Sequence, residues 1–494
     1  MPRFLADLAP LHSELILIFG AMLLLMWGVF RPETEREADL VTWAAIAVLI
    51  LAGGVLASQP LGTQTLFDGS FRFDAFARFV KIITLIASAG ALLLAPNDMR
   101  AGKYLKFEYP VLVLLATAGM LMMISANDLI SLYLALELQS LALYVLAAFH
   151  RDDVRSSEAG LKYFVLGALS SGMLLYGASL IYGFTGATQF NDIATVALGQ
   201  GAGQNIGLIF GVVFLMVGLA FKISAVPFHM WTPDVYQGAP TPVTAFFAAA
   251  PKAAAFALLT RVLITAFGGI KPQWQQVIIF LSIASMALGA VAAIGQTSIK
   301  RLMAYSSIGN MGYVLIGLAA ASPEGIEGVL IYLAVYLVMT LGAFAVILSM
   351  RRASGPVENV DDLAGLATTN PGMAATMAMM MFSMAGIPPL AGFWGKYYVF
   401  LAAVKADLWA LAIIGVIASV VGAYYYIRIV IIMYTSEAAA GAQNRFLQVP
   451  MREGFVMALS CLIILLGFLP FPLRNGSLGD WIIGTASAAA RSLF

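Results

Sequence analysis

Residues 218–227 read GLAFKISAVP, which places Lys222 at the end of an apolar run and five residues before Pro227. Proline lacks a backbone N–H and clashes with the preceding turn, so a helix that carries Lys222 should break or end here. At the centre of a membrane helix a lysine costs roughly 2.5–3.5 kcal/mol. Irregular backbone at membrane depth is tolerated only where protein or water solvates it. If the surrounding chain is a membrane protein, this stretch predicts a broken helix built around an ionisable group.

The composition places the chain among polytopic membrane proteins. Of its 494 residues, 61% are hydrophobic and 11% are charged, and the mean hydropathy is +0.90. Apolar runs of about 20 residues, the length that crosses roughly 30 Å of hydrocarbon, recur along the chain. We therefore predict an all-α protein with about 14 transmembrane helices. The predicted spans lie near 11–30, 41–58, 74–95, 110–125, 129–149, 158–184, 205–228, 241–268, 275–296, 301–321, 326–350, 371–403, 408–434 and 453–470.

Charge and cysteine content exclude several functions. The formal net charge is only +1, which argues against a nucleic-acid partner because phosphate backbones require a concentrated basic surface. The only cysteine, Cys461, can form neither an internal disulfide nor an iron–sulfur cluster. The first apolar run is long enough to span and lacks a short segment followed by a cleavage site, so we expect a retained helix.

A second interrupted run suggests an internal repeat. Residues 385–392 read AGIPPLAG and break the long run 371–403, and Lys396 follows this break. Broken helices in corresponding parts of two halves indicate inverted repeats around an ion site. Lys222 and Lys396 lie five runs apart, and a unit with an odd number of helices must invert. We predict N-terminal helices 1–3 in residues 1–109, one five-helix repeat in 110–268, its inverted counterpart in 269–434, and a fourteenth helix with a tail in 435–494.

Positively charged loops predict the orientation. Lysine and arginine concentrate on the cytoplasmic side of short loops. Loops on one side, which carry residues such as Arg151, Lys300 and Arg351, hold about twice as many of these cations as the opposing loops and termini. We therefore expect both termini outside, on the periplasmic face if the host is bacterial.

Glu137 and Lys162 are the first two candidate site residues. Glu137 lies eight residues into its run, roughly 12 Å deep, where a short carboxylate cannot reach the interface. It fits either a proton or partner site or a structural ion pair. Lys162 lies one turn into the sixth run, so its long side chain can reach the headgroups. If Lys162 instead faces Glu137, it stabilises the carboxylate and makes the pair a tunable acid.

Three further candidates follow later in the chain. Lys252 comes directly after Pro251 and ten residues after Pro242, roughly 15 Å into its helix, which is too deep for its ammonium to reach the interface. It fits proton transfer or a structural hydrogen bond, and the same two interpretations apply to Lys222 and Lys396. His229 lies near the expected cytoplasmic mouth. The usual pKa of histidine, near 6.5, suits proton transfer, but a structural role fits as well.

Three motifs resemble a known family. They are residues 221–243 (FKISAVPFHMWTPDVYQGAPTPV), 299–308 (IKRLMAYSSI) and 386–396 (GIPPLAGFWGK). All three are similar to the antiporter-like membrane subunits of respiratory complex I, NADH:quinone oxidoreductase, and the similarity runs over nearly the whole chain. Within that family the chain is most similar to the subunit N branch. The L branch has a long C-terminal lateral helix for which the residues after Pro470 leave no room, and the M branch usually has glutamate where Lys396 stands.

The resemblance implies a role for each candidate. It implies that Glu137 and Lys222 form a pair on helices five and seven, that Lys252 is the central lysine and that Lys396 ends the exit half-channel. Lys162 would modulate the pair and His229 would join the inner path. Some relatives have a histidine in the tenth helix where this chain has Gly309 and Asn310. A relay through that point would therefore use Asn310, Ser306, Ser307, Tyr305 or water.

The resemblance also implies the setting. The chain would be a proton-translocating subunit in a bacterial inner membrane, beside subunit M and small membrane subunits of the complex. It would bind no cofactor, because flavin, iron–sulfur clusters and quinone would belong to partner subunits. No metal site is expected. Two alternatives remain open: a subunit of a multi-subunit sodium/proton antiporter of the Mrp type, and a scaffold or coupling subunit that does not pump.

Overall fold

The computed structural model describes residues 8–60, 62–352, 355–436, 448–466 and 478–494, and these residues form an almost entirely helical bundle. Eleven described helices are long and apolar enough to cross a membrane. The other three expected spans coincide with a shorter helix, a broken helix pair and the last apolar helix. The predicted fold class is therefore confirmed, although residues 467–470 of the last predicted span lie outside the described residues.

The main helices follow the chain in this order. The first seven are α2 (His12–Val29), α3 (Glu35–Ser58), α4 (Ala75–Ala101), α5 (Glu108–Ser125), α6 (Leu129–Ala147), α7 (Val154–Thr185) and α9 (Ile206–Lys222). The remainder are α11 (Thr241–Ala248), α12 (Ala250–Arg261), α13 (Lys271–Ile294), α14 (Ile299–Ala320), α15 (Pro323–Ser349), α17 (Pro371–Ala385), α18 (Ala391–Lys405), α19 (Trp409–Thr435) and α20 (Met451–Leu466).

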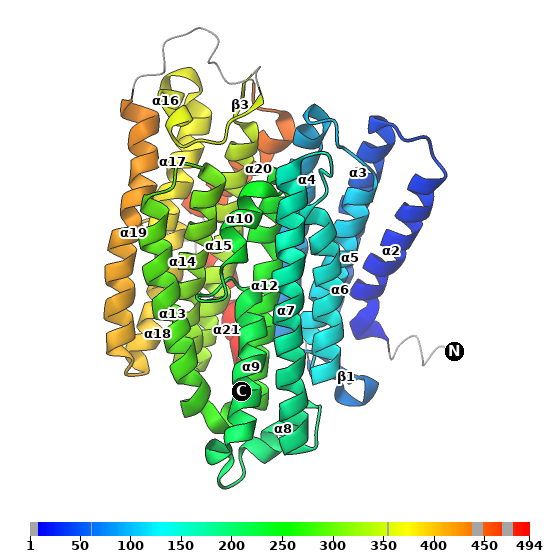
Figure 1. The fold of residues 1–494 in the computed structure, drawn as a ribbon, viewed down its shortest axis with the longest axis vertical. Helices are drawn as coiled ribbons and strands as arrows, with labels where there is room; N and C mark the ends of the chain where they lie inside the picture. Colours follow the sequence, from blue (N-terminus) through cyan, green and yellow to red (C-terminus); the bar gives the residue numbers. More distant parts are fainter. Residues whose placement is uncertain (1–7, 61, 353–354, 437–447, 467–477) are drawn as a thin grey trace.

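Short elements connect these helices. They comprise α8 (Phe190–Ala197), α10 (Trp231–Gly238), α16 (Leu366–Thr369), the π-turn η4 (Val262–Ala266) and the 3-10 turns η1 (Ala9–Leu11), η2 (Phe67–Gly69), η3 (Ala202–Gln204), η5 (Gly268–Ile270) and η6 (Asp361–Leu363). Two small antiparallel ribbons pair β1 (Gln64–Leu66) with β2 (Phe71–Phe73) and β3 (Arg351–Arg352) with β4 (Gly355–Pro356). Figure 1 shows β1 and α8 at one end of the bundle and α16 and β3 at the other.

Local sequence explains where several helices begin and how closely they pack. The carboxylate of Asp74 accepts a hydrogen bond from the backbone N–H of Ala77, and Asp128 caps α6 in the same way, which satisfies N–H groups that a helix start leaves free. Helices α13 and α14 pack with glycine against glycine. A Cβ on Gly289 would lie 2.6 Å from the backbone nitrogen of Gly309, so a larger residue would force these helices apart.

Both predicted helix breaks are present. Helix α9 ends at Lys222, and the backbone then turns through Ser224, which has a positive φ of 63°. Helix α17 ends at Gly386, whose φ of 88° suits a residue without a Cβ, and α18 begins only at Ala391. Each break lies within one or two turns of an interior lysine, as the proline positions predicted.

A third break, which the sequence analysis did not predict, interrupts the span expected over 241–268, although Thr241–Ala266 still has the length and composition of one membrane span. Helices α11 and α12 are separated at Ala249, whose φ of −108° and ψ of −93° are not helical. Pro251 follows this residue and cannot donate the hydrogen bond that would continue the preceding helix. Lys252 therefore lies in the first turn of a new helix rather than deep inside one.

The C-terminal tail contains a helix that the sequence did not predict. Helix α21 (Leu478–Arg491) packs against α4 and α15 and buries Ala486, Ala489 and Ala490. After it, the Oγ of Ser492 accepts a 3.1 Å hydrogen bond from the backbone N–H of Phe76. The tail is thus tied to the start of α4, at the same end of the bundle as β1.

Candidate functional site

The first cluster of candidate residues joins α6 to the broken end of α9. Lys222 is buried, and its Nζ donates a 2.7 Å hydrogen bond to the Oγ of Ser140. The hydroxyl of Tyr144 lies 3.5 Å from the same Nζ. Ser140 lies three residues after Glu137, so the two share one face of α6. The Lys222 ammonium therefore contacts α6 one turn from Glu137 and lies within Coulombic reach of its carboxylate.

Glu137 and Lys222 do not form a direct ion pair in the described part of the chain. Glu137 is half-buried, and its Oε1 is buried without a hydrogen-bond partner among the described residues. On the same helix, Leu134 and Leu141 are 63% and 57% exposed. A carboxylate beside such an apolar stripe faces bilayer or a partner subunit, and an unpaired buried oxygen requires water or a partner donor.

Lys162 fits the first of the two interpretations from the sequence, because its ammonium lies in an exposed setting and not at Glu137. Its Nζ contacts Glu158 at 2.7 Å and Asp234 at 3.0 Å, and its side chain is 42% exposed. Arg301 binds the second oxygen of Asp234 at 2.7 Å. Burial would raise the pKa of Asp234, but the hydrogen bonds from Lys162 and Arg301 outweigh it and hold that pKa below its usual value. The described contacts of Lys162 are those of an exposed ion-pair cluster, so any effect on Glu137 would act at a distance.

His229 lies seven residues after Lys222, in the connection between α9 and α10. Its ring is half-buried, and its Nδ1 has no hydrogen-bond partner among the described residues. The adjacent Met230 is 63% exposed. The structure therefore places His229 near the surface, and no described contact joins it to Lys222.

Lys252 begins a chain of buried hydroxyls. Its Nζ donates a hydrogen bond to the Oγ of Ser307 on α14 and lies 5.6 Å from the ring centroid of Tyr236. The Ser307 hydroxyl is in turn 2.7 Å from the hydroxyl of Tyr336 on α15. Each of these hydroxyls can both donate and accept, so together they can pass a proton onward.

A second hydroxyl group adjoins the first. The Oγ of Ser306, next to Ser307, is 2.5 Å from the hydroxyl of Tyr426 on α19. The side-chain amide of Asn310 donates to that same hydroxyl at 3.2 Å and accepts from Tyr332 at 2.7 Å. Three of the residues expected at this point are therefore buried and hydrogen-bonded. Tyr305, the fourth, is half-buried and has no side-chain hydrogen bond in the described structure.

Lys396 lies at the far side of this network. Its Nζ donates to the carbonyl of Ala385 at 3.0 Å and to the Oγ of Ser419 at 2.8 Å, and it lies 4.6 Å from the ring centroid of Tyr313. The free carbonyl exists because α17 stops at Gly386. A cavity of about 10 Å³, room for about one water molecule, is lined by Lys396, Ser419 and Tyr426 among others. One water there can connect Lys396 to the Tyr426 hydroxyl.

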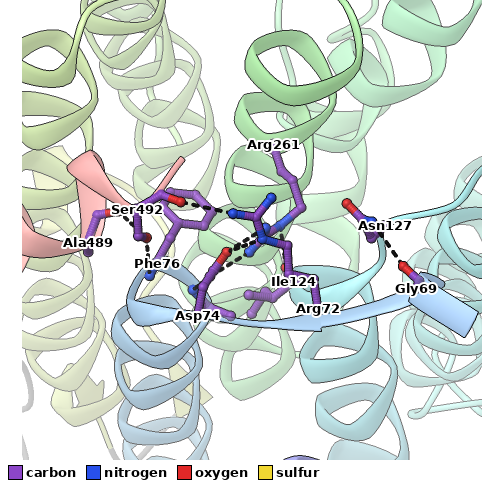
Figure 2. Close-up of polar contacts among 10 residues, drawn as sticks. Gly69, Arg72, Asp74, Phe76, Ile124, Asn127, Arg261, Ala489 and Ser492 are labelled. Atoms are coloured by element: carbon purple, nitrogen blue, oxygen red, sulfur yellow. Dashed lines mark hydrogen bonds and ion pairs between the residues drawn. The ribbon is translucent and has the colours of Figure 1, made fainter. Parts of the chain in front are cut away.

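Two buried ion pairs lie outside the candidate site. Glu14 on α2 and Lys81 on α4 contact at 2.6 Å, and both side chains are fully buried. Arg261 on α12 binds both carboxylate oxygens of Asp74, at 2.8 and 2.9 Å (Figure 2). Glu14, Lys81 and Asp74 were not among the residues predicted from the sequence. Their signal was present in the sequence, because charged residues stand near the starts of two apolar runs.

The pair between Asp74 and Arg261 extends to the C-terminus. Arg72 contacts Asp74 at 3.0 Å and donates a 3.0 Å hydrogen bond to the carbonyl of Ser492. Arg261 also donates to the carbonyl of Ile124. These contacts join four separate segments, which identifies the cluster as a structural tie. Among the described residues, no group of three or more His, Cys, Asp or Glu side chains lies close enough together to hold a metal ion.

Comparison with known proteins gives the family. Residues 126–422 match the family model described as NADH:quinone oxidoreductase/Mrp antiporter, TM. The chain is 58% identical to NADH-quinone oxidoreductase subunit N of Methylobacterium nodulans over 99% of this chain and 98% of the relative. The chain belongs to the NADH-quinone oxidoreductase subunit N family. Subunit N 1 of Rhizobium meliloti is 57% identical, over 99% of both chains.

Solved structures agree with this family. A chain of respiratory complex I from Thermus thermophilus with bound aureothin is 32% identical, with a TM-score of 0.78 over 93% of this chain and 97% of that chain. A chain of the Mrp complex from Dietzia sp. DQ12-45-1b has a TM-score of 0.81 at 22% identity, over 99% and 97%. At that identity the second likeness shows a shared fold. The three sequence motifs thus pointed to the correct family.

Proposed function

We propose that this chain is the proton-translocating subunit N of a bacterial NADH:quinone oxidoreductase and that Glu137, Lys222, Lys252 and Lys396 transfer protons. One observation carries the site assignment. Lys252 on α12 and Lys396 on α18 each hydrogen-bond to a side-chain hydroxyl, of Ser307 and of Ser419, and no described carboxylate neutralises either lysine. Buried lysines without an anion are costly, and they are found where membrane proteins move ions.

In this proposal the network between Lys252 and Lys396 is a proton wire. A proton leaving Lys252 passes to Ser307 and Tyr336 and would then cross through water to Ser306 and Tyr426, because no described hydrogen bond joins the two pairs. The water-sized cavity completes the path to Lys396. Since hydroxyls donate and accept at once, the wire needs only rotation of each group after a proton has passed. Asn310 and Tyr332 would hold the Tyr426 hydroxyl in place.

Glu137 and Lys222 would load this wire. When the Glu137 carboxylate is charged it stabilises the Lys222 ammonium one turn away, and when its charge is neutralised the ammonium loses that stabilisation and releases its proton. The unpaired oxygen of Glu137, beside an exposed apolar stripe, would sense the adjacent subunit. Lys162 and His229 would have accessory roles, the first through the Asp234 ion pairs and the second at the mouth.

The remaining assignments concern the surroundings. Redox chemistry, with flavin, iron–sulfur clusters and quinone, would occur in partner subunits, and this chain would hold none of these groups. Its neighbours would be subunit M, small membrane subunits and inner-membrane lipid. The excess of basic loops on one side supports an orientation with both termini in the periplasm. We also retain the division into residues 1–109, 110–268, 269–434 and 435–494, with two inverted repeats.

Two other functions remain testable. An Mrp-type sodium/proton antiporter subunit shares the fold, but the relatives that are 57% and 58% identical over almost the whole chain are named as NADH-quinone oxidoreductase subunits. A scaffold or coupling role would need the same ion pairs at the bundle end but would not need the hydroxyl wire. The hydroxyls that adjoin both buried lysines therefore favour proton transfer.

Replacing Lys222 with alanine in the assembled complex tests the proposal. Sealed vesicles would be given NADH, and proton uptake and NADH oxidation would be measured together, with Lys405→Ala as the matched control because Lys405 is an exposed lysine at the end of α18. We expect Lys222→Ala to lower both rates and Lys405→Ala to leave them unchanged. Parental values for Lys222→Ala would remove Lys222 from the mechanism and favour the scaffold function.

A further inference from the structure

A large apolar groove lies between α4, α15, α20 and α21, away from the lysines. Its volume is about 540 Å³, within the range of roughly 300–1,000 Å³ that is typical of sites for small ligands. The side chains along its length are almost all aliphatic or aromatic. Its walls include Ile82, Ile86, Leu337, Leu341, Ile463 and Trp481. An empty space of this size in an apolar setting leaves its walls without contacts, so an apolar occupant is favoured.

One positively charged side chain, that of Arg78, lies at the end of the groove. Arg78, in the first turn of α4, lines it together with Ala57 and Ala75. Its guanidinium donates to the carbonyls of Gln59, at 2.9 Å, and Ala57. In the described part of the chain no carboxylate lies within ion-pair distance of Arg78, and two of its five donors are used. The remaining donors and the positive charge are available to an anion.

The groove runs along the helices from this cation toward the middle of the bundle. Arg78, Ile82 and Ile86 are spaced four residues apart, so they form one stripe on α4 about 12 Å long. The C-terminal end of α4 is joined to the C-terminal end of α15 by an ion pair of 2.7 Å between Asp98 and Arg351, so the two helices run parallel. The charged end of the groove therefore lies at the bundle end that holds the C-terminus, and the apolar part points inward.

This polarity is that of a membrane lipid. We propose that the groove binds an anionic phospholipid, with the phosphate at Arg78 and an acyl chain along the stripe to Ile86 and Leu341. Water does not fit, because an apolar cavity offers it no hydrogen-bond partners.

The bound lipid has a consequence for the interior of the bundle. Leu337 and Val338 line the groove, and they directly follow Tyr336, whose hydroxyl contacts Ser307 on the other side of α15. An acyl chain in the groove keeps water away from this helix. This consequence rests on the proposed function. The proposal that the groove binds a lipid rests only on the groove and on Arg78.

Photolabelling of the assembled complex tests the site. The complex would be placed in vesicles containing phosphatidylglycerol with a diazirine in its acyl chain, or phosphatidylcholine with the same chain, and labelled peptides would be mapped by mass spectrometry. We expect the anionic probe to label α4, α15 and α21 more strongly than the zwitterionic probe, by about fivefold for attraction to one arginine.

Two variants sharpen the test. Arg78→Gln should reduce labelling by the anionic probe to the level of the zwitterionic probe, and Ala488→Trp, which fills the groove, should abolish labelling by both. Val420→Trp on α19, at a residue that is 71% exposed, is the matched control and should change nothing. Equal labelling of α19 and the groove in the parent complex would overturn the proposal. So would cross-linking of the groove helices to another subunit in place of lipid.

Discussion

The ammonium of Lys222 donates a 2.7 Å hydrogen bond to the hydroxyl of Ser140. This bond crosses from the broken end of α9 to α6, and it brings the lysine to the turn that follows Glu137. Because Ser140 carries no charge, the ammonium is held in position without being neutralised. The arrangement leaves the stability of the charged lysine dependent on the Glu137 carboxylate.

Replacing Ser140 with alanine should weaken proton translocation. The variant removes one hydrogen bond from a buried ammonium, a loss of about 1.5–3 kcal/mol that corresponds to roughly a ten- to 150-fold change in an equilibrium. We expect proton uptake per unit of assembled complex to fall by a similar factor. Ser140→Thr keeps the hydroxyl and should retain most of the rate. If Ser140→Ala pumps at the parental rate, this bond does not position Lys222.

The Lys162→Gln variant distinguishes two roles for Lys162, surface ion pairing and control of Glu137. Its contacts to Glu158 and Asp234 are partly exposed, and such pairs contribute at most about 1 kcal/mol. The pKa of Asp234 is below its ordinary value of 3.8, so the pairs persist above that pH and weaken as the pH falls through the lowered value. We expect a small change in pumping at neutral pH that shrinks further in high salt. A loss as severe as that of Lys222→Ala would instead show that Lys162 controls Glu137.

Arg261→Ala should destabilise the complex more than it alters the chemistry. Removing one partner of a buried ion pair costs up to roughly 3–5 kcal/mol, and we expect less than that here because Arg72 still contacts Asp74 at 3.0 Å. Burial would raise the pKa of Asp74, but Arg261 outweighs it and holds that pKa below 3.8. The stabilisation is therefore complete above about pH 5 and is lost as the pH falls further. Thermal unfolding from pH 8 to pH 5 should show a constant deficit for the variant, and a deficit that vanishes at pH 8 would contradict the assignment.

The pair between Glu14 and Lys81 should behave non-additively. Lys81→Met leaves a buried carboxylate without its partner, whereas Glu14→Leu with Lys81→Met removes both charges. We expect the double variant to be more stable than Lys81→Met alone. Proton uptake in the assembled double variant should be parental if the pair is structural. A pumping defect in a stable double variant would add these residues to the proton path.

The sequence predicted most of the membrane topology because the signals for a membrane span and for a helix break are local in the sequence. A run of about 20 apolar residues marks a span, and Pro227 and the 388–389 proline pair mark breaks regardless of what surrounds them. Helix α21 was missed because its alanine-rich buried face is short and only weakly hydrophobic. The break at Ala249 was missed because alanine itself favours helices, although Pro251 next to it was a signal.

The sequence could predict that most of the candidate lysines are buried, but it could not predict what they contact. Burial of a lysine can be inferred from its neighbours in sequence, but its hydrogen-bond partner comes from another helix. Lys162 illustrates the limit, since Asp234 is 72 residues away in sequence and both Asp234 and Glu137 were possible partners. The hydroxyl wire depends on how α14, α15 and α19 meet, which no single stretch of sequence specifies.

The central claim is that protons pass between Lys252 and Lys396 through Ser307 and Ser306. The most direct measurement is protons taken up per NADH oxidised in vesicles that hold the assembled Ser306→Ala, Ser307→Ala double variant. Ser349→Ala is the matched control, because its buried hydroxyl bonds only to the carbonyl of Ala345 in its own helix. The account predicts that the double variant loses proton uptake by about tenfold or more, as expected when a proton-transfer group is removed, while Ser349→Ala equals the parent. Equal uptake per NADH in all three proteins, at the parental rate of oxidation, would contradict it.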